Sequence, residues 1–256
     1  MDMYQKRKIR AEKKNNDSQK SFSKVPISWF PGHMAKTRRQ ITEDLKMIDV
    51  VVEILDARIP NSSQNPDIRQ ITQNKKKIII LNKYDLADNA KTEKWIEYFN
   101  KKERKVVLAD SLTGKGVNET TRQIQKIMED EMQKMADKGR IGRKIRTMIV
   151  GIPNVGKSSF INRISKKTSA EVGNKPGVTK QKQWIRINKK IELLDTPGVL
   201  WPKFESQKVA MNLAITGTIK DDILDLVEVA YTLTKFMLEN YKENLLQRYS
   251  LEEKKI

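Results

Sequence analysis

The segment Gly151–Ser158 constrains this chain more than any other feature, because its sequence, GIPNVGKS, fits the pattern G-x-x-x-x-G-K-[ST] without a mismatch. The apolar run before it, residues 146–150, predicts a strand, and the residues after it predict a helix. In that context the motif forms a phosphate-binding loop. Its glycines let main-chain amides approach phosphate oxygens, and the helix start adds the positive end of its dipole. The loop predicts a nucleotide site, without deciding between ATP and GTP.

Two side chains of this loop have expected roles in phosphate chemistry. Lys157 is expected to reach the β- and γ-phosphates and to take part in catalysis, and the Ser158 hydroxyl is expected to bind Mg²⁺. The other residues of the segment that we expect to contact the nucleotide are Asn154, Val155, Gly156 and Ser159.

The sequence Asn82-Lys83-Tyr84-Asp85 follows a second predicted strand and indicates which base is bound. A carboxylate at Asp85 accepts hydrogen bonds from guanine N1–H and the exocyclic amine together, and adenine offers no such donor pair. Asn82 would brace the site, and the stem of Lys83 would cover the base. The segment Ser111-Leu112, after the next strand, is placed to offer a main-chain amide to the guanine oxygen. Alone, N-K-x-D also fits an ordinary strand-to-turn sequence; beside the phosphate loop it predicts GTP.

The sequence Asp195-Thr196-Pro197-Gly198 supplies the remaining expected parts of a nucleotide site. Asp195 is expected to hold Mg²⁺ through water, and the Gly198 amide to sense the γ-phosphate. Thr179 is the expected second metal hydroxyl. D-T-P-G by itself also fits a plain turn.

Short apolar runs alternating with helical stretches predict an α/β fold with a mostly parallel sheet covered on both faces. The predicted strands are residues 48–55, 77–81, 105–109, 146–150 and 191–194. Each nucleotide motif follows one of these strands, at the end where such sheets bind ligands. After residue 202 the chain is expected to be helical, with apolar residues at helix spacing from Ile223 to Met237 and acids at the helix start at Asp221 and Asp222.

The order of the motifs is unusual, because N-K-x-D at residue 82 precedes the phosphate loop at residue 151. Ras-like GTPases have the opposite order. The same sheet forms from this order if the usual chain ends are joined and new ends are opened, which is a circular permutation. A glycine-containing basic linker at residues 138–146 is the expected joint. We therefore expect a flexible basic arm at residues 1–24, a permuted P-loop GTPase domain at 25–202 and a small α-helical C-terminal domain at 203–256.

Composition narrows the classes of function and partner. The 256 residues contain no cysteine and one histidine, His33, which excludes disulfide scaffolds and thiol catalysis and argues against cysteine- or histidine-ligated metals. The net charge of +19 points to a polyanion such as nucleic acid, although a generally lysine-rich surface would give the same total. Residues 1–24 carry a net +5 and are either an RNA-binding arm or an inert tail, whereas residues 203–256 are close to neutral.

The chain resembles the ribosome biogenesis GTPase A family of circularly permuted GTPases from about residue 27 to 253. Besides the nucleotide motifs, the matching segments are Trp29–Met34 (WFPGHM), Asp56–Pro60 (DARIP) and Leu200–Phe204 (LWPKF). The resemblance implies an enzyme that hydrolyses GTP, binds the large ribosomal subunit and its rRNA in the cytoplasm, and leaves on hydrolysis. It also implies a monomer with no membrane or DNA partner. A GTP-gated RNA-binding scaffold with little turnover and a GTPase of the small subunit remain alternatives.

The residues that assist hydrolysis are expected to differ from those of Ras-like enzymes. Val199 stands where those enzymes have a glutamine that positions water, and valine can neither orient nor polarise water. The resemblance implicates His33 in this role; a purely structural histidine is the alternative. Asn154 matches the asparagine that helps to ligate K⁺ in similar potassium-activated GTPases, where the ion neutralises transition-state charge. The alternative is an asparagine that only suits the loop geometry.

Overall fold

The computed structural model describes residues 32–102, 104–166, 183–202, 204 and 206–251. The expected arm at residues 1–24 and the expected metal ligand Thr179 lie outside these residues. The strands are β1 (Val50–Asp56), β2 (Lys76–Asn82), β3 (Lys105–Ala109), β4 (Ile145–Val150), β5 (Gln183–Arg186) and β6 (Ile191–Asp195). The α-helices are α2 (Gly32–Asp44), α3 (Pro66–Ile71), α4 (Asn89–Asn100), α5 (Val117–Asp137), α6 (Lys157–Ser165), α7 (Gln207–Ile215), α8 (Leu226–Asn240) and α9 (Lys242–Tyr249). Short 3₁₀ turns are η1 (Leu45–Met47), η2 (Tyr84–Leu86) and η3 (Asp221–Ile223).

In the part of the chain that the structure describes, the strands form one sheet in the order β3-β2-β1-β4-β6-β5. All neighbours are parallel except β5, which pairs antiparallel with β6. The predicted α/β class and mostly parallel sheet are therefore confirmed. The sequence analysis did not predict β5, an edge strand in which Ile185 is the only buried residue.

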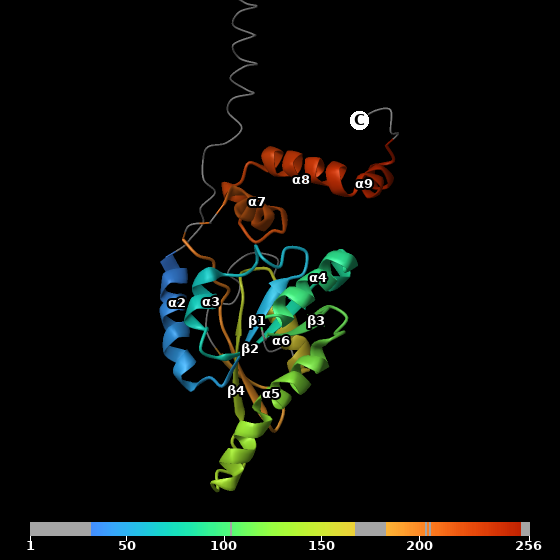
Figure 1. Cartoon of the computed structure of the whole chain (residues 1–256). Helices are drawn as coiled ribbons and strands as arrows, with labels where there is room; N and C mark the ends of the chain where they lie inside the picture. The colour runs from blue at the N-terminus through green and yellow to red at the C-terminus, as the bar shows by residue number, and fades with distance from the viewer. Residues whose placement is uncertain (1–31, 103, 167–182, 203, 205, 252–256) are drawn as a thin grey trace, which may run out of the picture.

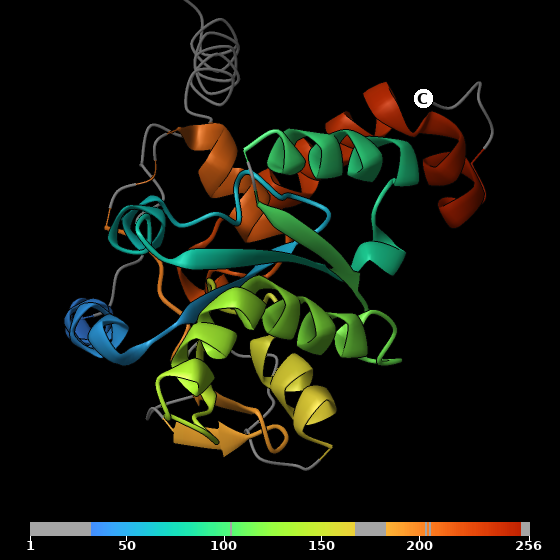
Figure 2. The same ribbon diagram turned by 60° about the horizontal axis from the view of Figure 1, so that its bottom comes forward.

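Alternation along β2 shows how the sheet is covered on both faces. Ile78 and Ile80 belong to a large apolar cluster that includes Ile124 of α5, whereas Ile79 and Leu81 pack in a second cluster with Phe99 of α4. Figure 2 shows α5 and α6 on one face of the sheet and α4 on the other. Successive strand residues point to opposite faces, so a strand buried on both sides is apolar at nearly every position.

The permuted order predicted from the sequence is present in the sheet. β1 lies between β2 and β4, although β4 begins almost a hundred residues later in the chain. The predicted joint after α5 turns at Gly139 and Gly142, which both have positive φ. Asp49, directly before β1, binds this joint: its carboxylate accepts from the Arg143 guanidinium at 2.7 Å and from the Arg146 amide at 2.8 Å.

The expected C-terminal helices are present as α7, α8 and α9, which lie beyond the carboxyl ends of the strands (Figure 1). The start of α8 differs from the prediction: Asp221 lies in the 3₁₀ turn η3, and Asp225 caps the helix by accepting from the amides of Val227 and Glu228. Within the described ranges, no helix is long and apolar enough to cross a membrane.

Candidate functional site

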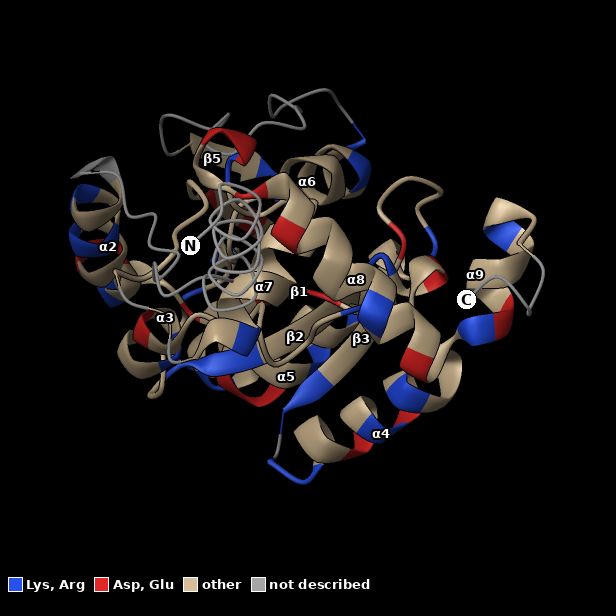
Figure 3. Cartoon of the chain, turned by 90° about the horizontal axis from the view of Figure 1, so that it is seen from above, with Lys and Arg blue, Asp and Glu red and all other residues tan. Residues whose placement is uncertain are grey.

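The predicted motifs meet at the carboxyl edge of the sheet, which Figure 3 views from above. Asn82, at the end of β2, is almost fully buried and joins three of them. Its Nδ2 donates to the Val155 carbonyl at 2.7 Å, and its Oδ1 accepts from the Ser111 amide at 3.2 Å and hydroxyl at 2.7 Å. One side chain thus fixes the expected base motif against both the phosphate loop and the loop after β3.

Gly156 makes this close approach possible. Its φ of +93° lies in the left-handed region, and a Cβ there would stand 2.3 Å from Asn82 Nδ2. Any other residue would push the phosphate loop away from the end of β2. The glycine therefore places Lys157 at the first position of α6, where the main-chain amides point toward a bound anion.

Lys83 adopts a left-handed conformation, with φ of 59°, and reaches under the phosphate loop. Its Nζ donates to the Asn154 carbonyl at 2.7 Å and lies 3.1 Å from Asp56 Oδ2. Asp56 also accepts two bonds from the Arg58 guanidinium, at 2.9 and 2.6 Å. Burial by itself would raise the pKa of Asp56, but Arg58 and Lys83 hold that pKa below its usual value.

Asp56 and Arg58 are site residues to which the sequence analysis gave no role, because D-A-R entered it only as part of a resemblance. The available signal was an acid at the end of a predicted strand next to the one that carries N-K-x-D. Hydrogen bonding to Asp56 raises the pKa of Arg58, and the nearby charge of Asp85 adds to this rise. Asp85 itself is solvent-exposed in η2, where its carboxylate is open to a base.

The amides of the loop after β3 have partners within the protein. The Ser111 amide is used by Asn82, and the Leu112 amide donates to Asp110 Oδ1 at 2.8 Å. Both amides of the segment that was expected to offer one to the guanine oxygen therefore donate within the protein in this conformation. The Leu112 side chain is exposed above them.

Lys157 is buried beneath the phosphate loop, where its Nζ donates to the Ile152 carbonyl at 3.0 Å. Burial lowers the pKa of Lys157 to about 8, against the opposing charge of Asp195. Gly198 lies directly against this group, because a Cβ at that position would be 2.8 Å from Lys157 Nζ and 2.9 Å from the Pro153 nitrogen. The structure thus brings D-T-P-G into contact with the phosphate loop.

Asp195, at the end of β6, is fully buried, and neither of its carboxylate oxygens has a hydrogen-bond partner within ordinary limits in the described part of the chain. Burial raises its pKa to about 6, although the charge of Lys157 opposes this shift. A buried, unsatisfied carboxylate needs a cation or water. Together with Ser158 in the first turn of α6, it fits Mg²⁺, which takes oxygen ligands and keeps several waters. No group of three or more His, Cys, Asp or Glu side chains that could hold a metal is present among the described residues.

Val199 and His33 bear on the water that attacks the phosphate. Val199 is buried in the main apolar cluster, and its carbonyl accepts from Asn65 Nδ2 at 2.8 Å. His33 stands in the first turn of α2, and its side chain lies outside the described residues. The next residue, Met34, is buried with its sulfur 3.4 Å from the Leu200 amide, so α2 begins beside the segment that follows D-T-P-G.

Asn154 connects the phosphate loop with the C-terminal helices. It has a left-handed φ of 59°, and its side-chain amide donates to the carbonyl of Gly217, which follows α7. A second contact joins Asn212 of α7 to the hydroxyl of Ser62 at 2.9 Å. The helical region therefore contacts the nucleotide site directly.

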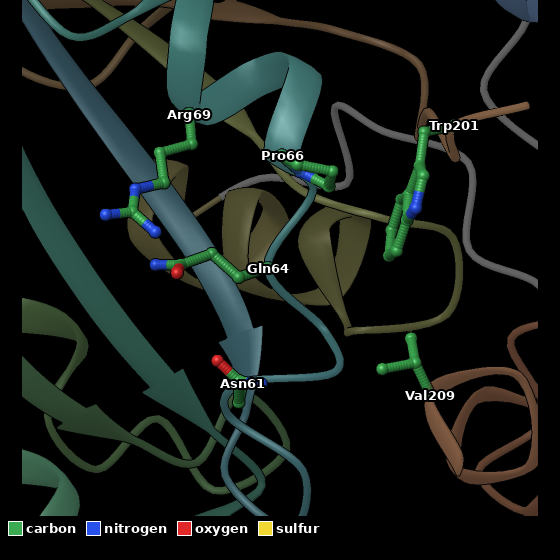
Figure 4. A pocket seen from close by; sticks show the side chains of 6 residues that line it. All are labelled: Asn61, Gln64, Pro66, Arg69, Trp201 and Val209. Atoms are coloured by element: carbon green, nitrogen blue, oxygen red, sulfur yellow. The ribbon is translucent and has the colours of Figure 1, made fainter. Parts of the chain in front are cut away.

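A pocket lies between residues that follow β1 and residues that follow the D-T-P-G segment (Figure 4). It is lined by Asn61, Gln64, Pro66, Arg69, Trp201 and Val209. The predicted nucleotide-binding residues are not part of its lining.

Comparisons with known proteins agree with this geometry. Residues 146–255 match the family model described as 50S ribosome-binding GTPase. Ribosome biogenesis GTPase A of Bacillus cereus is 50% identical over 227 residues, covering 89% of this chain and 77% of that protein. GNP-bound YlqF from T. maritima is 27% identical with a TM-score of 0.54, covering 85% of this chain and 78% of that one. The GDP-bound structure of TM YlqF is 25% identical with a TM-score of 0.56, covering 84% and 86%. This chain therefore belongs to the ribosome biogenesis GTPase A family and is an enzyme of ribosome biogenesis that hydrolyses GTP.

Proposed function

We propose that this chain, when GTP is bound, binds the large ribosomal subunit through the rRNA of that subunit. GTP hydrolysis, assisted by Mg²⁺ and K⁺, then releases the protein from the subunit. Three parts share this work: a basic arm at residues 1–24, a GTPase domain at residues 25–202 and a helical domain at residues 203–256. The protein works as a cytoplasmic monomer. The family model that matches the chain, described as a 50S ribosome-binding GTPase, favours the large subunit as the partner.

The observation that carries the nucleotide part is the bridge made by Asn82 between Val155 and Ser111. This bridge keeps the base motif and the phosphate loop at a fixed separation, as recognition of a whole nucleotide requires. Guanine pairs with Asp85 and lies against the stem of Lys83. The Leu112 amide reaches the guanine oxygen once it leaves Asp110. The phosphates lie on the loop that ends at Ser158 and Ser159.

Hydrolysis uses the residues beneath and beside the γ-phosphate. The Lys157 ammonium turns from the Ile152 carbonyl to the phosphate oxygens, and the Gly198 amide donates to the γ-phosphate. Ser158 and Thr179, with Asp195 acting through water, would hold Mg²⁺, which when bound would supply positive charge next to the phosphates. His33 orients the attacking water, and Asn154 binds K⁺.

Release follows from the contacts between the helical region and the site. Asn154 donates to Gly217, and the chain continues from Gly198 to α7, which begins at Gln207. A change at the γ-phosphate therefore reaches α7 through both links, which makes the helical region the element that moves. The basic residues of the arm add salt-sensitive attraction to RNA.

The base assignment is tested with Asp85→Asn. The amide replaces an acceptor with a donor, so this variant should prefer xanthine over guanine nucleotides while the phosphate contacts stay intact. Binding of GTP, XTP and ATP by the wild type and the variant measures this preference. Equal affinity of the wild type for ATP and GTP would contradict the assignment.

The partner and the role of His33 are tested by single-turnover GTP cleavage with purified large or small subunits, with binding measured in parallel. We expect large subunits, and not small subunits, to stimulate GTP cleavage, and we expect this stimulation in K⁺ rather than Na⁺.

The His33→Ala variant should bind normally and slow the stimulated step by about 10²- to 10⁴-fold, as loss of a positioning or proton-handling group does. Deletion of residues 1–24 should lower affinity and its salt dependence. Stimulation by small subunits, or binding without any stimulated turnover, would favour the small-subunit or scaffold alternative.

A further inference from the structure

Asp56, at the end of β1, forms ion pairs with two side chains, Arg58 and Lys83. Asp56 is almost fully buried, and both of its oxygens are used. Oδ1 accepts from the Arg58 amide at 3.1 Å and Nε at 2.9 Å, and Oδ2 accepts from Arg58 Nη2 at 2.6 Å and lies 3.1 Å from Lys83 Nζ. The bidentate contact fixes the orientation of the carboxylate, because the guanidinium fork is planar and rigid.

This carboxylate determines where a long, otherwise adaptable side chain ends. The Lys83 ammonium lies between two acceptors, Asp56 Oδ2 and the Asn154 carbonyl, which come from β1 and from the phosphate loop. With its main chain in the left-handed region and its tip held from two sides, the stem of Lys83 has little freedom left. Holding four methylene groups in place before a ligand arrives removes a cost of ordering that binding would otherwise include.

We propose that Asp56 and Arg58 are positioning residues for guanine nucleotides: Asp56 holds Lys83 as a preformed platform for the base, and Arg58 holds Asp56. The inference rests on the guanine site proposed above and extends it to residues that do not touch the nucleotide. It also gives a reason for the spacing D-x-R at the end of β1, because the Arg58 guanidinium donates to the carboxylate of Asp56, two residues earlier in the chain.

The opposite end of the same strand offers a matched control. Asp49 precedes β1 and also receives an arginine, with Arg143 Nη2 at 2.7 Å, together with the Arg146 amide at 2.8 Å. The chemistry is the same, an aspartate with a guanidinium and a main-chain amide, but this pair fastens the joint between α5 and β4. Its contacts do not include the nucleotide motifs.

The experiment compares Asp56→Asn with Asp49→Asn. The affinities for GDP and GTP are measured with a fluorescent guanine nucleotide, and turnover is measured at saturating GTP. Loss of the charge that holds Lys83 should weaken GDP and GTP alike, by about tenfold, the size expected for one charge-assisted hydrogen bond. Asp49→Asn should leave both affinities unchanged. Turnover of Asp56→Asn at saturation should stay within about twofold, because its effect is in binding rather than in the chemical step.

A second arm keeps the test decisive if Asp56→Asn folds poorly. Arg58→Gln removes the partner of Asp56 at a partly exposed position and should cost about threefold in both affinities, as a weaker loss of the same positioning. In a Lys83→Met background, Asp56→Asn should add almost nothing, because the two residues act through one contact.

The inference is overturned if Asp56→Asn and Arg58→Gln bind nucleotides as Asp49→Asn does, or if Asp56→Asn keeps its full effect without Lys83. Asp85→Asn, measured in parallel, separates the two levels of proposal. A shift of that variant from guanine to xanthine supports the site itself, and the Asp56 result then decides the positioning role alone. No shift would mean that the guanine site is wrongly assigned.

Discussion

Every residue of β1, from Val50 to Asp56, is buried, whereas no residue of α8, from Leu226 to Asn240, is buried. α8 is nevertheless apolar: Val227 is 71% exposed and Tyr231 is 62% exposed. The sheet and α7 thus share one apolar core, which includes Leu213 and Ile219, whereas α8 contributes no buried residue to it. Parts of a protein with few buried contacts open at low free-energy cost, so the comparison identifies α8 as the element that can change position.

The largest expected difference concerns a lysine buried in the sheet and a lysine of α4 that contacts the helical region. Lys77 and Glu53 form a buried ion pair in the sheet at 3.2 Å. Lys77→Met leaves the Glu53 carboxylate buried without its partner and should cost about 3–5 kcal/mol of unfolding free energy. Lys91, whose Nζ donates to Tyr241 at the helical region, is the control: Lys91→Met should cost about 0.5 kcal/mol. Urea unfolding measures both, and similar losses would contradict the comparison.

Deletion of apolar groups should give the next largest difference. Ile80 is fully buried at the centre of β2, and Ile80→Ala should lower the free energy of unfolding by about 2–5 kcal/mol. Val227→Ala in α8 removes methyl groups that are already in water and should stay within about 0.5 kcal/mol. A comparable loss at Val227, measured with the protein alone, would mean that α8 is packed after all.

The smallest effect should be local to the helical region. The Tyr241 hydroxyl donates to Asp88 at 2.9 Å and accepts from Lys91, which joins the junction of α8 and α9 to the start of α4. Tyr241→Phe should cost about 1 kcal/mol, the usual size of one hydrogen bond. Amide hydrogen exchange should speed up in α8 and α9 and remain unchanged in β1. Faster exchange in β1 as well would show that the two regions unfold together.

The strands and the positions of the motifs were predictable because long apolar runs and a phosphate loop are strong local signals. β5 was missed because Trp184 is 45% exposed and only Ile185 is buried, so the strand carries no apolar run. Its existence depends on pairing with β6. The expected helix start at Asp221 failed because a later aspartate, Asp225, offers a cap to the same helix.

That the motifs lie together at the carboxyl edge of the sheet was predictable, and the contacts between them were less so. The roles of Asp85 toward guanine and of Lys157 toward phosphate stay predictions. The ion pair of Asp56 with Lys83 joins two strands that are neighbours only in the folded sheet. The engagement of the Leu112 amide by Asp110 depends on a turn geometry that the sequence does not reveal.

The strand order also determines how the chain can assemble during synthesis. The first three strands, β1, β2 and β3, are contiguous in space, and so are β4, β6 and β5, so the sheet is two sequential halves that meet at a single parallel seam between β1 and β4. The half with the base motif leaves the ribosome first and can pair its strands before the phosphate half exists. One edge of β1 then stays unpaired until β4 emerges, which exposes the nascent chain to mispairing. A nucleotide that touches both halves spans this seam, so GTP and GDP favour the completed sheet.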